Sequence, residues 1–168
     1  MVIEAMSAAD WPAVREIYAD GIATGHATFA EAPPATYDDF CASAIPTGSL
    51  VTRDELGVVV GWTRITRVSQ RSVYAGVAEV SVYVAQGARG RGLGDALMRE
   101  LVLRSEAAGI WTLQASIFEE NLASAALHAR HGFRVVGRRE RIGKMPAIGP
   151  RAGKWRDTLF LERRSAFV

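Results

Sequence analysis

The sequence predicts an α/β domain with a mixed sheet, and two patterns carry this prediction. Over Val77–Ala85 every second residue is Ala or Val, which is typical of a strand. Shortly after it, Leu93, Leu97 and Leu101 recur at a helical spacing and mark one face of a helix. The length of 168 residues suits one domain with a buried core, so residues 1–168 are expected to form a single domain.

The first third of the chain is predicted to hold one strand and two helices. Ser7 followed by Asp10 resembles a capping box, with Asp in place of Glu or Gln, and it opens a helix with Val14, Ile17 and Tyr18 on one face. The residues that follow are loop-like and reach a Pro-Pro pair. In order, we expect a strand at Val2–Ala5, this helix, a loop over residues 21–35 and a short helix at Thr36–Ala44.

The other two thirds are predicted to contain mainly strands. Asp54-Glu55 lies between two apolar runs, as in a hairpin, and Gly109 and Gly132 each follow a helical stretch, as helix-ending glycines do. This order of elements is typical of a mixed sheet flanked by helices. The expected elements are strands at Leu50–Arg53, Leu56–Val68 and Val77–Ala85, a helix that ends at Gly109, a strand at Ile110–Phe118, a helix at Asn121–His131, a strand at Phe133–Ile142, a loop over residues 143–155 and a strand at Thr158–Glu162.

Composition excludes several classes of protein and site. The single cysteine, Cys41, excludes an internal disulfide and a cysteine-based metal cage, and the histidines His26, His128 and His131 lack zinc spacing. Neither His26 nor His131 is expected to have a chemical role. The chain has no long uncharged apolar run and no Lys/Arg-headed secretory signal. We therefore expect a cytoplasmic protein that binds no metal and no membrane.

Charge is unevenly distributed along the chain, although the net charge is only +2. Residues 1–60 carry nine acids and two bases, whereas residues 130–168 carry three acids and eleven bases. One interpretation is a dipolar surface, and the other is a basic region that faces an anionic ligand. The basic segment shows neither a recognition-helix motif nor regular aromatic interleaving, so no nucleic-acid partner is expected.

A glycine-rich loop joins the strand at Val77–Ala85 to the helix after it. Val82–Gly94 reads VYVAQGARGRGLG, with four glycines and two arginines. Free N–H groups and the dipole at a helix N-terminus favour phosphate, and glycines allow close approach and positive φ. Arg89 and Arg91 add positive charge. A simple turn is the alternative, but it needs only one glycine, so Gly90–Gly94 is interpreted as a phosphate cradle.

This loop matches one known phosphate-binding signature and fails two others. A P-loop needs a Gly-Lys-Ser/Thr ending, and the dinucleotide pattern G-x-G-x-x-G would need glycine where Asp95 stands. Arg89–Gly94, RGRGLG, instead matches the R/Q-x-x-G-x-G/A signature of the GCN5-related N-acetyltransferase (GNAT) family. Asn121–Phe133, NLASAALHARHGF, resembles the family's second hallmark, an Asn, a small residue and usually a Tyr before Gly-Phe. The sequence is therefore identified as a member of this family.

Three further segments resemble the phosphinothricin/methionine-sulfoximine acetyltransferase branch of the family, namely Ala27–Glu31, Ala78–Val84 and Gly153–Asp157. The chain departs from this branch in two places. An arginine that methionine-sulfoximine acetylators carry aligns with Ala75, and the segment Lys144–Ala152 is several residues longer than usual. Both departures fall where the acceptor amine is expected, so the resemblance to the branch does not settle the acceptor.

The resemblance implies direct transfer of an acetyl group from acetyl-CoA to an amine, without a metal. A protonated amine must lose a proton before it attacks, and the leaving thiolate must be stabilised. Glu79 is the candidate base, with an outward-facing strand carboxylate as the alternative. His128 stands where many relatives carry the Tyr that protonates the thiolate, and it either donates that proton or only packs beside the coenzyme. The residues implied in coenzyme binding are Val82, Tyr83, Val84, Arg89, Gly90, Arg91, Gly92, Leu93, Gly94, Asp95, Asn121 and Ser124, with a plain helix N-cap as the alternative for Asn121.

The acceptor is expected to be a small primary amine of the phosphinothricin or methionine-sulfoximine kind. Its candidate contacts are Phe29, Trp62 and Tyr74, which are equally typical of a core, and Arg151 and Arg156, which would clamp a carboxylate in two-pronged fashion. Two alternative functions stay open: acetylation of a protein N-terminus or lysine, and a coenzyme-A sensor without catalysis. The branch also implies a homodimer.

Overall fold

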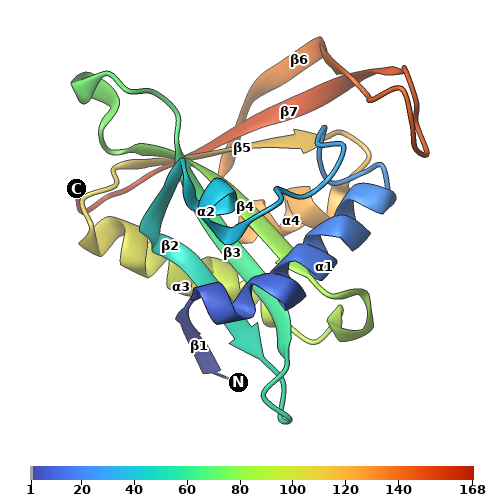
Figure 1. Cartoon of the computed structure of the whole chain (residues 1–168). Helices are drawn as coiled ribbons and strands as arrows, with labels where there is room; N and C mark the ends of the chain where they lie inside the picture. The colour runs from blue at the N-terminus through green and yellow to red at the C-terminus, as the bar shows by residue number, and fades with distance from the viewer. Residues whose placement is uncertain (1) are drawn as a thin grey trace.

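A seven-stranded sheet forms the centre of the structure (Figure 1). The computed structural model describes residues 2–168, and its strand order is β1-β2-β3-β4-β5-β7-β6. Every neighbouring pair is antiparallel except β4 and β5, which confirms the predicted α/β fold with a mixed, mostly antiparallel sheet flanked by helices. The elements are β1 (Val2–Ala5), α1 (Trp11–Ala23), α2 (Tyr37–Cys41), β2 (Ala44–Arg53), β3 (Val59–Arg67), β4 (Val77–Val84), α3 (Leu93–Ala107), β5 (Thr112–Phe118), α4 (Leu122–Arg130), β6 (Arg134–Lys144) and β7 (Trp155–Arg164).

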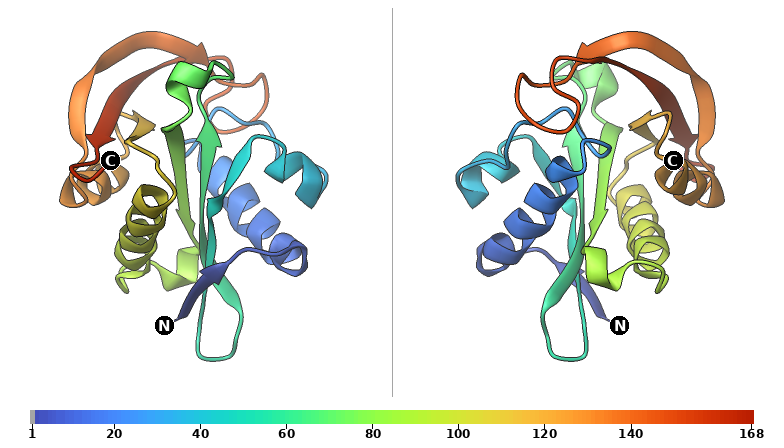
Figure 2. Two further views of the ribbon diagram at one scale, coloured as in Figure 1. Left: turned by 90° about the vertical axis from the view of Figure 1, so that its left-hand side faces the viewer. Right: turned by 90° about the vertical axis from the view of Figure 1, so that its right-hand side faces the viewer.

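The helices cover both faces of the sheet, and each face has its own apolar core (Figure 2). Helices α1 and α2 lie on one face, where Val14 and Phe40 pack against Trp62 of β3. Helices α3 and α4 lie on the other face, where Leu97 and Leu101 belong to the larger cluster. Alternation along β4 sends its side chains to both cores, which makes β4 the central strand of the structure.

Helix α1 runs farther than the sequence predicted. The predicted capping box is present, because Ser7 donates its N–H to the Asp10 carboxylate (2.8 Å), but it caps a 3-10 turn over Ala8–Asp10 that leads into α1. The loop expected from residue 21 begins only after Ala23. Gly21 is still helical and buried, and a Cβ there would lie 2.6 Å from the Tyr83 ring. Packing of α1 on the sheet therefore prolongs the helix through a residue that usually ends one.

Three strands are also longer than predicted, because pairing across the sheet outweighs irregular local patterns. β2 begins at Ala44, six residues before the predicted strand, and its register with β3 shifts between Ile45 and Leu50. β6 continues to Lys144 through a shift that includes Arg141, whose φ is 47°. β7 extends beyond the predicted strand at both ends. Such bulges break the period-2 alternation that sequence analysis depends on.

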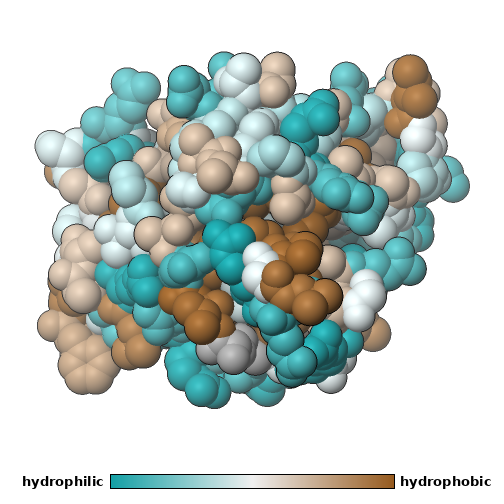
Figure 3. All heavy atoms as spheres, turned by 60° about the horizontal axis from the view of Figure 1, so that its bottom comes forward, coloured by the Kyte–Doolittle hydropathy of each residue, from teal (hydrophilic) through white to brown (hydrophobic). Residues whose placement is uncertain are grey.

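The outer surface carries hydrophobic residues in small groups. On the face shown in Figure 3, these groups lie between mostly hydrophilic residues. Leu56 and Val58, in the β2–β3 hairpin, are among the exposed apolar side chains. Within residues 2–168, no helix is both long and apolar enough to cross a bilayer.

The parallel pair β4–β5 opens into a fork. The two strands pair at only three positions, and the last of these places Glu79 opposite Gln114. Beyond it, β4 stays paired with β3 as far as Val84, and β5 stays paired with β7 as far as Phe118. The sheet therefore splits in its middle, and the split positions the candidate site.

Candidate active site

A cavity of about 960 Å³ occupies the split between β4 and β5. Its size is within the usual range for small-molecule sites. Most of the predicted site residues line it, although Arg91, Tyr74, Arg151 and Arg156 do not. Those that do are Phe29, Glu79, Val82, Tyr83, Val84, Arg89, Gly90, Gly92, Leu93, Gly94, Asp95, Asn121, Ser124 and His128.

One edge of β4 presents unpaired backbone groups to this cavity. At its C-terminal end, Ala85 donates its N–H to the Val60 carbonyl on the β3 side (2.9 Å). Backbone groups alternate in direction along a strand, so those of Val82 and Val84 point the opposite way, toward the split, where the Val84 carbonyl accepts from Arg89 Nε. An extended, amide-containing arm can pair with such an edge as an added strand. The predicted coenzyme contacts at positions 82 and 84 are thus backbone contacts.

The glycine-rich loop presents further unpaired donors. From Gly90 to Asp95, no backbone N–H has an acceptor within residues 2–168. Gly90 and Gly92 have φ of 75° and 77°, in the left-handed region that other residues rarely adopt. Gly92 is also the N-cap of α3, so the positive end of the helix dipole adds to the donors. These donors fit a pyrophosphate such as that of acetyl-CoA.

The two arginines of the loop have different surroundings. Arg89 lines the cavity and donates from Nε to the Val84 carbonyl (3.2 Å). Arg91 is exposed and lies outside the cavity lining. Arg89 is therefore the arginine of the signature that is held beside the cradle.

Asp95 reaches the cavity already paired with cations. Its carboxylate meets Arg130 Nε at 3.2 Å, His131 Nε2 at 3.1 Å and Arg99 at 3.3 Å. Hydrogen bonds from Arg130 and His131 lower the pKa of the Asp95 carboxyl, so it stays charged. A bare carboxylate would repel phosphate, whereas here it holds Arg130 at the mouth of the cradle. His131, for which no role was expected, belongs to this cluster.

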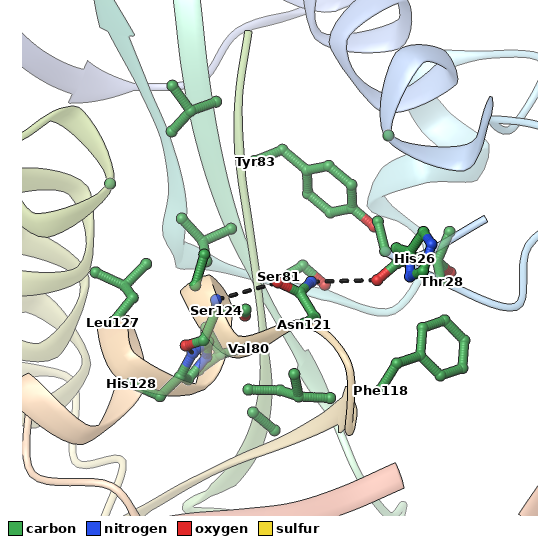
Figure 4. A pocket seen from close by; sticks show the side chains of 18 of the residues that line it. His26, Thr28, Val80, Ser81, Tyr83, Phe118, Asn121, Ser124, Leu127 and His128 are labelled. Carbon is green, nitrogen blue, oxygen red and sulfur yellow. Dashed lines mark hydrogen bonds between the residues drawn. The ribbon is translucent and has the colours of Figure 1, made fainter. Parts of the chain in front are cut away.

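Asn121 links the coenzyme end of the cavity to the loop after α1. Its side-chain oxygen accepts from the Ser124 N–H (3.1 Å), which caps α4, and its Nδ2 donates to the His26 carbonyl (3.2 Å), as Figure 4 shows. The N-cap alternative for Asn121 is therefore present in the structure. The second bond was not foreseen, because it joins residues 95 positions apart.

His128 is buried against Phe133, with only 2% of its surface exposed. Its Nδ1 lies 2.8 Å from the Ser124 carbonyl, so this nitrogen carries the proton and donates it. Nε2 is buried and has no partner within residues 2–168. Burial lowers the pKa of His128, so the ring is neutral near pH 7. A neutral ring in this tautomer has no proton at Nε2 to give to a thiolate.

Three carboxylates line the cavity, and they differ in their partners. Asp95 is paired at the coenzyme end, and Glu120 accepts from the Arg156 guanidinium (3.0 Å). Glu79 is held by a neutral donor instead, the Gln114 side-chain amide, whose Nε2 lies 3.1 Å from Glu79 Oε2. No ion pair reaches Glu79 within residues 2–168. It is thus the lining carboxylate that a substrate proton can reach without displacing a cation.

Aromatic rings enclose the end of the cavity beyond Glu79. Phe29 lies edge-on to Phe118 with centroids 4.8 Å apart, and both rings line the cavity. The Tyr83 ring is stacked on Trp62 at 4.5 Å, and burial raises the pKa of its hydroxyl. Trp62 itself is only 1% exposed and belongs to the core, whereas Tyr74 is 44% exposed and lies away from the cavity.

The two arginines predicted to clamp a carboxylate are placed differently. Arg156 is 4% exposed, donates to the Gly25 carbonyl (2.8 Å) and to Glu120, and lies 3.9 Å above the Phe118 ring. Arg151 is partly exposed: its NH2 lies 3.1 Å from His26 Nε2, and its NH1 lies 4.0 Å from a Glu120 carboxylate oxygen, beyond hydrogen-bond distance. Arg156 is thus fully engaged within the chain, while Arg151 keeps free donors beside a cavity-lining residue.

Several lining residues had no signal in the sequence. His26, Thr28, Phe118 and Glu120 come from two loops and a strand end that are far apart in the chain. Gln114 is one of three polar residues, with Thr112 and Ser116, that alternate with apolar residues along β5, so no local pattern singles it out. Within residues 2–168, no group of three or more potential ligands could hold a metal ion.

Comparison with known proteins places this architecture in a family. A sequence model of the Acetyltransferase (GNAT) family matches residues 11–133. The L-methionine sulfoximine/L-methionine sulfone acetyltransferase of Pseudomonas aeruginosa is 32% identical over 160 residues, which span 92% of this chain and 88% of the relative.

Two solved structures extend the comparison to the fold. The phosphinothricin acetyltransferase of Sinorhizobium meliloti in complex with acetyl-CoA has a TM-score of 0.84 at 32% identity, covering 97% of this chain and 87% of that one. The ribosomal-protein-alanine N-acetyltransferase of Brucella melitensis has a TM-score of 0.84 at 29% identity, covering 98% and 100%. With the unpaired β4 edge and the glycine cradle, these matches show that the chain belongs to the GNAT family of acetyl-CoA-dependent N-acetyltransferases.

Proposed function

We propose that the chain transfers the acetyl group of acetyl-CoA directly to the primary amine of a small amino-acid analogue, with Glu79 as the base. The observation that carries this proposal is the placement of Glu79. It lies at the apex of the β4–β5 split, and it alone among the three lining carboxylates has no cationic partner within residues 2–168. A general base needs a free lone pair within reach of the proton that it removes.

The coenzyme supplies an acetyl thioester, whose C–S bond breaks as the new C–N bond forms. The backbone N–H groups from Gly90 to Asp95 hold its pyrophosphate, and the unpaired β4 edge holds its arm. An arm that runs back along this edge from Val84 ends beside Glu79. The Val82 N–H is then placed to donate to the thioester oxygen, where negative charge develops.

Glu79 takes the proton from the amine, directly or through a water molecule. For His128 we favour packing beside the coenzyme over proton donation. Its proton is on Nδ1 and is used by the Ser124 carbonyl, and burial lowers its pKa. Asn121 and Ser124 line the same wall of the cavity and are proposed as polar coenzyme contacts.

The acceptor end supports a small acceptor that carries a carboxylate or phosphinate. Phe29 and Phe118 enclose its apolar part, and Arg151 offers free guanidinium donors beside His26. Arg156 holds the wall of the cavity together, because both of its polar contacts are within the chain. Arg151 comes from the long loop between β6 and β7, which thereby replaces the arginine that is missing at Ala75.

A thiol-release assay with acetyl-CoA and a panel of amines tests this function. The panel should contain methionine sulfoximine, phosphinothricin, natural amino acids, neutral polyamines and short peptides. We expect the highest kcat/KM for the amino-acid analogues. Equal rates with neutral polyamines would contradict a carboxylate-reading acceptor site.

A protein N-terminus is the second candidate acceptor, and one comparison favours it. The Brucella melitensis structure, which is described as a ribosomal-protein-alanine N-acetyltransferase, covers this chain as completely as the phosphinothricin enzyme does. Both reactions require the same base and coenzyme site, so the acceptor end alone separates them. A higher kcat/KM for peptides with N-terminal alanine than for free amino acids would establish this alternative.

We also infer that the enzyme is a cytoplasmic homodimer that associates through β6 and β7. β6 is an edge strand that is exposed along almost its whole length, and its side chains include Val135, Val136 and Ile142. Trp155 adds an exposed ring at the start of β7. An edge strand has unpaired backbone groups with which a second chain can pair, and these exposed apolar side chains would then be covered. Light scattering should give twice the chain mass of 18.2 kDa, whereas a monomeric mass would contradict the inference.

A further inference from the structure

Gln114 donates a side-chain hydrogen bond to the proposed base Glu79, although it does not line the cavity. It lies on β5 at the last position where β5 pairs with β4, directly opposite Glu79. Paired residues in neighbouring strands direct their side chains to the same face of the sheet. The Gln114 amide therefore meets the carboxylate across the apex of the split, with Nε2 donating to Oε2 at 3.1 Å.

The charged groups on the neighbouring strands are used elsewhere. On β3, Thr66 stands opposite Glu79, and Arg64 on the same face donates to the Phe40 carbonyl. On β7, Glu162 stands opposite Gln114 and is paired with Arg134. The neutral amide of Gln114 is therefore the polar contact recorded for the Glu79 carboxylate within residues 2–168.

A neutral amide suits a catalytic base better than a cation would. An arginine or lysine at this position would bind the carboxylate strongly and reduce its ability to accept a proton. An amide N–H fixes one oxygen without adding a charge, and it does not titrate. The other oxygen, Oε1, remains available to the substrate. Fixed orientation matters, because a misplacement of about 1 Å can cost roughly a hundred-fold in rate.

We propose that Gln114 is a positioning residue for the acetyl transfer: its amide orients the Glu79 carboxylate at the apex of the β4–β5 split. This inference rests on the proposed role of Glu79 as base. It adds that β5, which contributes no reacting group, determines the direction in which the base points. The effect is transmitted through one hydrogen bond between the last paired residues of the two strands.

Steady-state kinetics on Gln114→Leu and Gln114→Glu test the proposal. Gln114→Leu keeps the size of the side chain but loses the donor, so we expect kcat to fall about ten- to a hundred-fold with little change in the KM for acetyl-CoA. Gln114→Glu places a second carboxylate beside the first, and two adjacent carboxylates share a proton. The acidic limb of the kcat/KM profile should then move to higher pH.

Thr112→Val is the matched control, because Thr112 lies on β5 two residues before Gln114, on the same face, and no side-chain hydrogen bond joins it to Glu79 within residues 2–168. It should leave kcat and the pH profile unchanged. Thermal melting of each variant separates loss of fold from loss of rate. This inference would be overturned if Gln114→Leu kept the parental kcat and pH profile while the separate Glu79→Gln variant was inactive. That result would leave the base assignment intact. Full activity of Glu79→Gln would instead overturn the base assignment, and the positioning role with it.

Discussion

The two ends of the cavity are built from different kinds of atoms. At the coenzyme end the donors are mainly backbone groups, from the unpaired edge of β4 and from Gly90 to Asp95, a single stretch of the chain. At the acceptor end the lining consists of side chains from the loop after α1, from β4, and from the end of β5. Backbone donors depend on local conformation, whereas convergent side chains depend on the whole fold.

This difference explains why one end of the cavity can be predicted from the sequence more easily than the other. A backbone cradle requires glycines and a helix start within a few residues, so it leaves a compact signature such as Arg89–Gly94. At the proposed acceptor end, Phe29 meets Phe118 and His26 meets Arg151 from distant segments, and no local spacing records these contacts. Five substitutions test the comparison, and they are taken in order of decreasing expected effect, with Arg151→Ala placed beside Arg156→Ala as its counterpart.

Glu79→Gln should have the largest effect, because it should reduce turnover while leaving coenzyme binding intact. The amide keeps the shape of the carboxylate but cannot accept the proton, so kcat should fall by roughly a hundred- to ten-thousand-fold. Binding of acetyl-CoA, measured as the rise in melting temperature, should persist because the cradle is untouched. Parental turnover in this variant would show that another group, or water alone, removes the proton.

Arg156→Ala should damage the wall of the acceptor end. It removes hydrogen bonds to Gly25 and Glu120 and the packing on Phe118. The Glu120 carboxylate can be hydrated once Arg156 is gone, which limits the cost of losing the ion pair. We therefore expect the free energy of unfolding, measured by urea denaturation, to fall by about 2 kcal/mol. Arg151→Ala is the matched comparison and should change stability by less than about 0.5 kcal/mol.

Arg156→Ala and Arg151→Ala also distinguish an effect on stability from an effect on the choice of acceptor. Arg151→Ala should raise the KM for amines that carry a carboxylate and leave that for neutral amines unchanged, because only the former use a guanidinium clamp. Unchanged kinetics for both classes would remove Arg151 from the acceptor site.

Gly92→Val should weaken the coenzyme end. A β-branched residue at φ of 77° is strained by about 1–2 kcal/mol, so the loop must shift and the row of N–H donors is lost. We expect the dissociation constant of acetyl-CoA to rise about ten-fold or more, as measured by calorimetry. Gly87→Val is the control, since Gly87 lies in the same loop with an ordinary φ and open space around its Cβ position. Equal loss of binding in both variants would contradict the specific role of Gly92.

His128→Phe should have the smallest effect, and it concerns pH. Burial lowers the pKa of His128 in the folded state below its ordinary value of 6.5, so the unfolded chain binds a proton that the folded chain does not. Stability therefore falls as pH drops below about 6.5, and the variant should lose this part of the dependence below that pH. Melting temperatures of both proteins across that range measure it.

The same variant tests the chemistry of His128. If the ring only packs, kcat for His128→Phe should stay close to the parental value at pH 7. A hundred-fold loss of kcat with unchanged coenzyme affinity would restore His128 as the proton donor to the thiolate.

Sequence analysis was most successful where one local rule applied. The order of strands and helices, the hairpin around Asp54 and the helix ends at Gly109 and Gly132 all follow from short-range patterns, and the structure confirms them. It failed at Gly21, where the helix continues because α1 packs on Tyr83. It also shortened β2, because the register shift after Ile45 interrupts the alternation.

The sequence by itself determined the α/β class, the glycine-rich loop that is the proposed phosphate cradle, and the identity of the family. Each depends on residues within about a dozen positions of one another, where steric preferences and backbone donors act directly. Tertiary structure alone decided that Glu79 lacks a cation while Asp95 and Glu120 have one. It also decided that Gln114 stands opposite Glu79, the proposed base, because that contact depends on where the parallel strands β4 and β5 stop pairing. Strand pairing between distant segments sets such distances, and a linear pattern of residue types does not contain them.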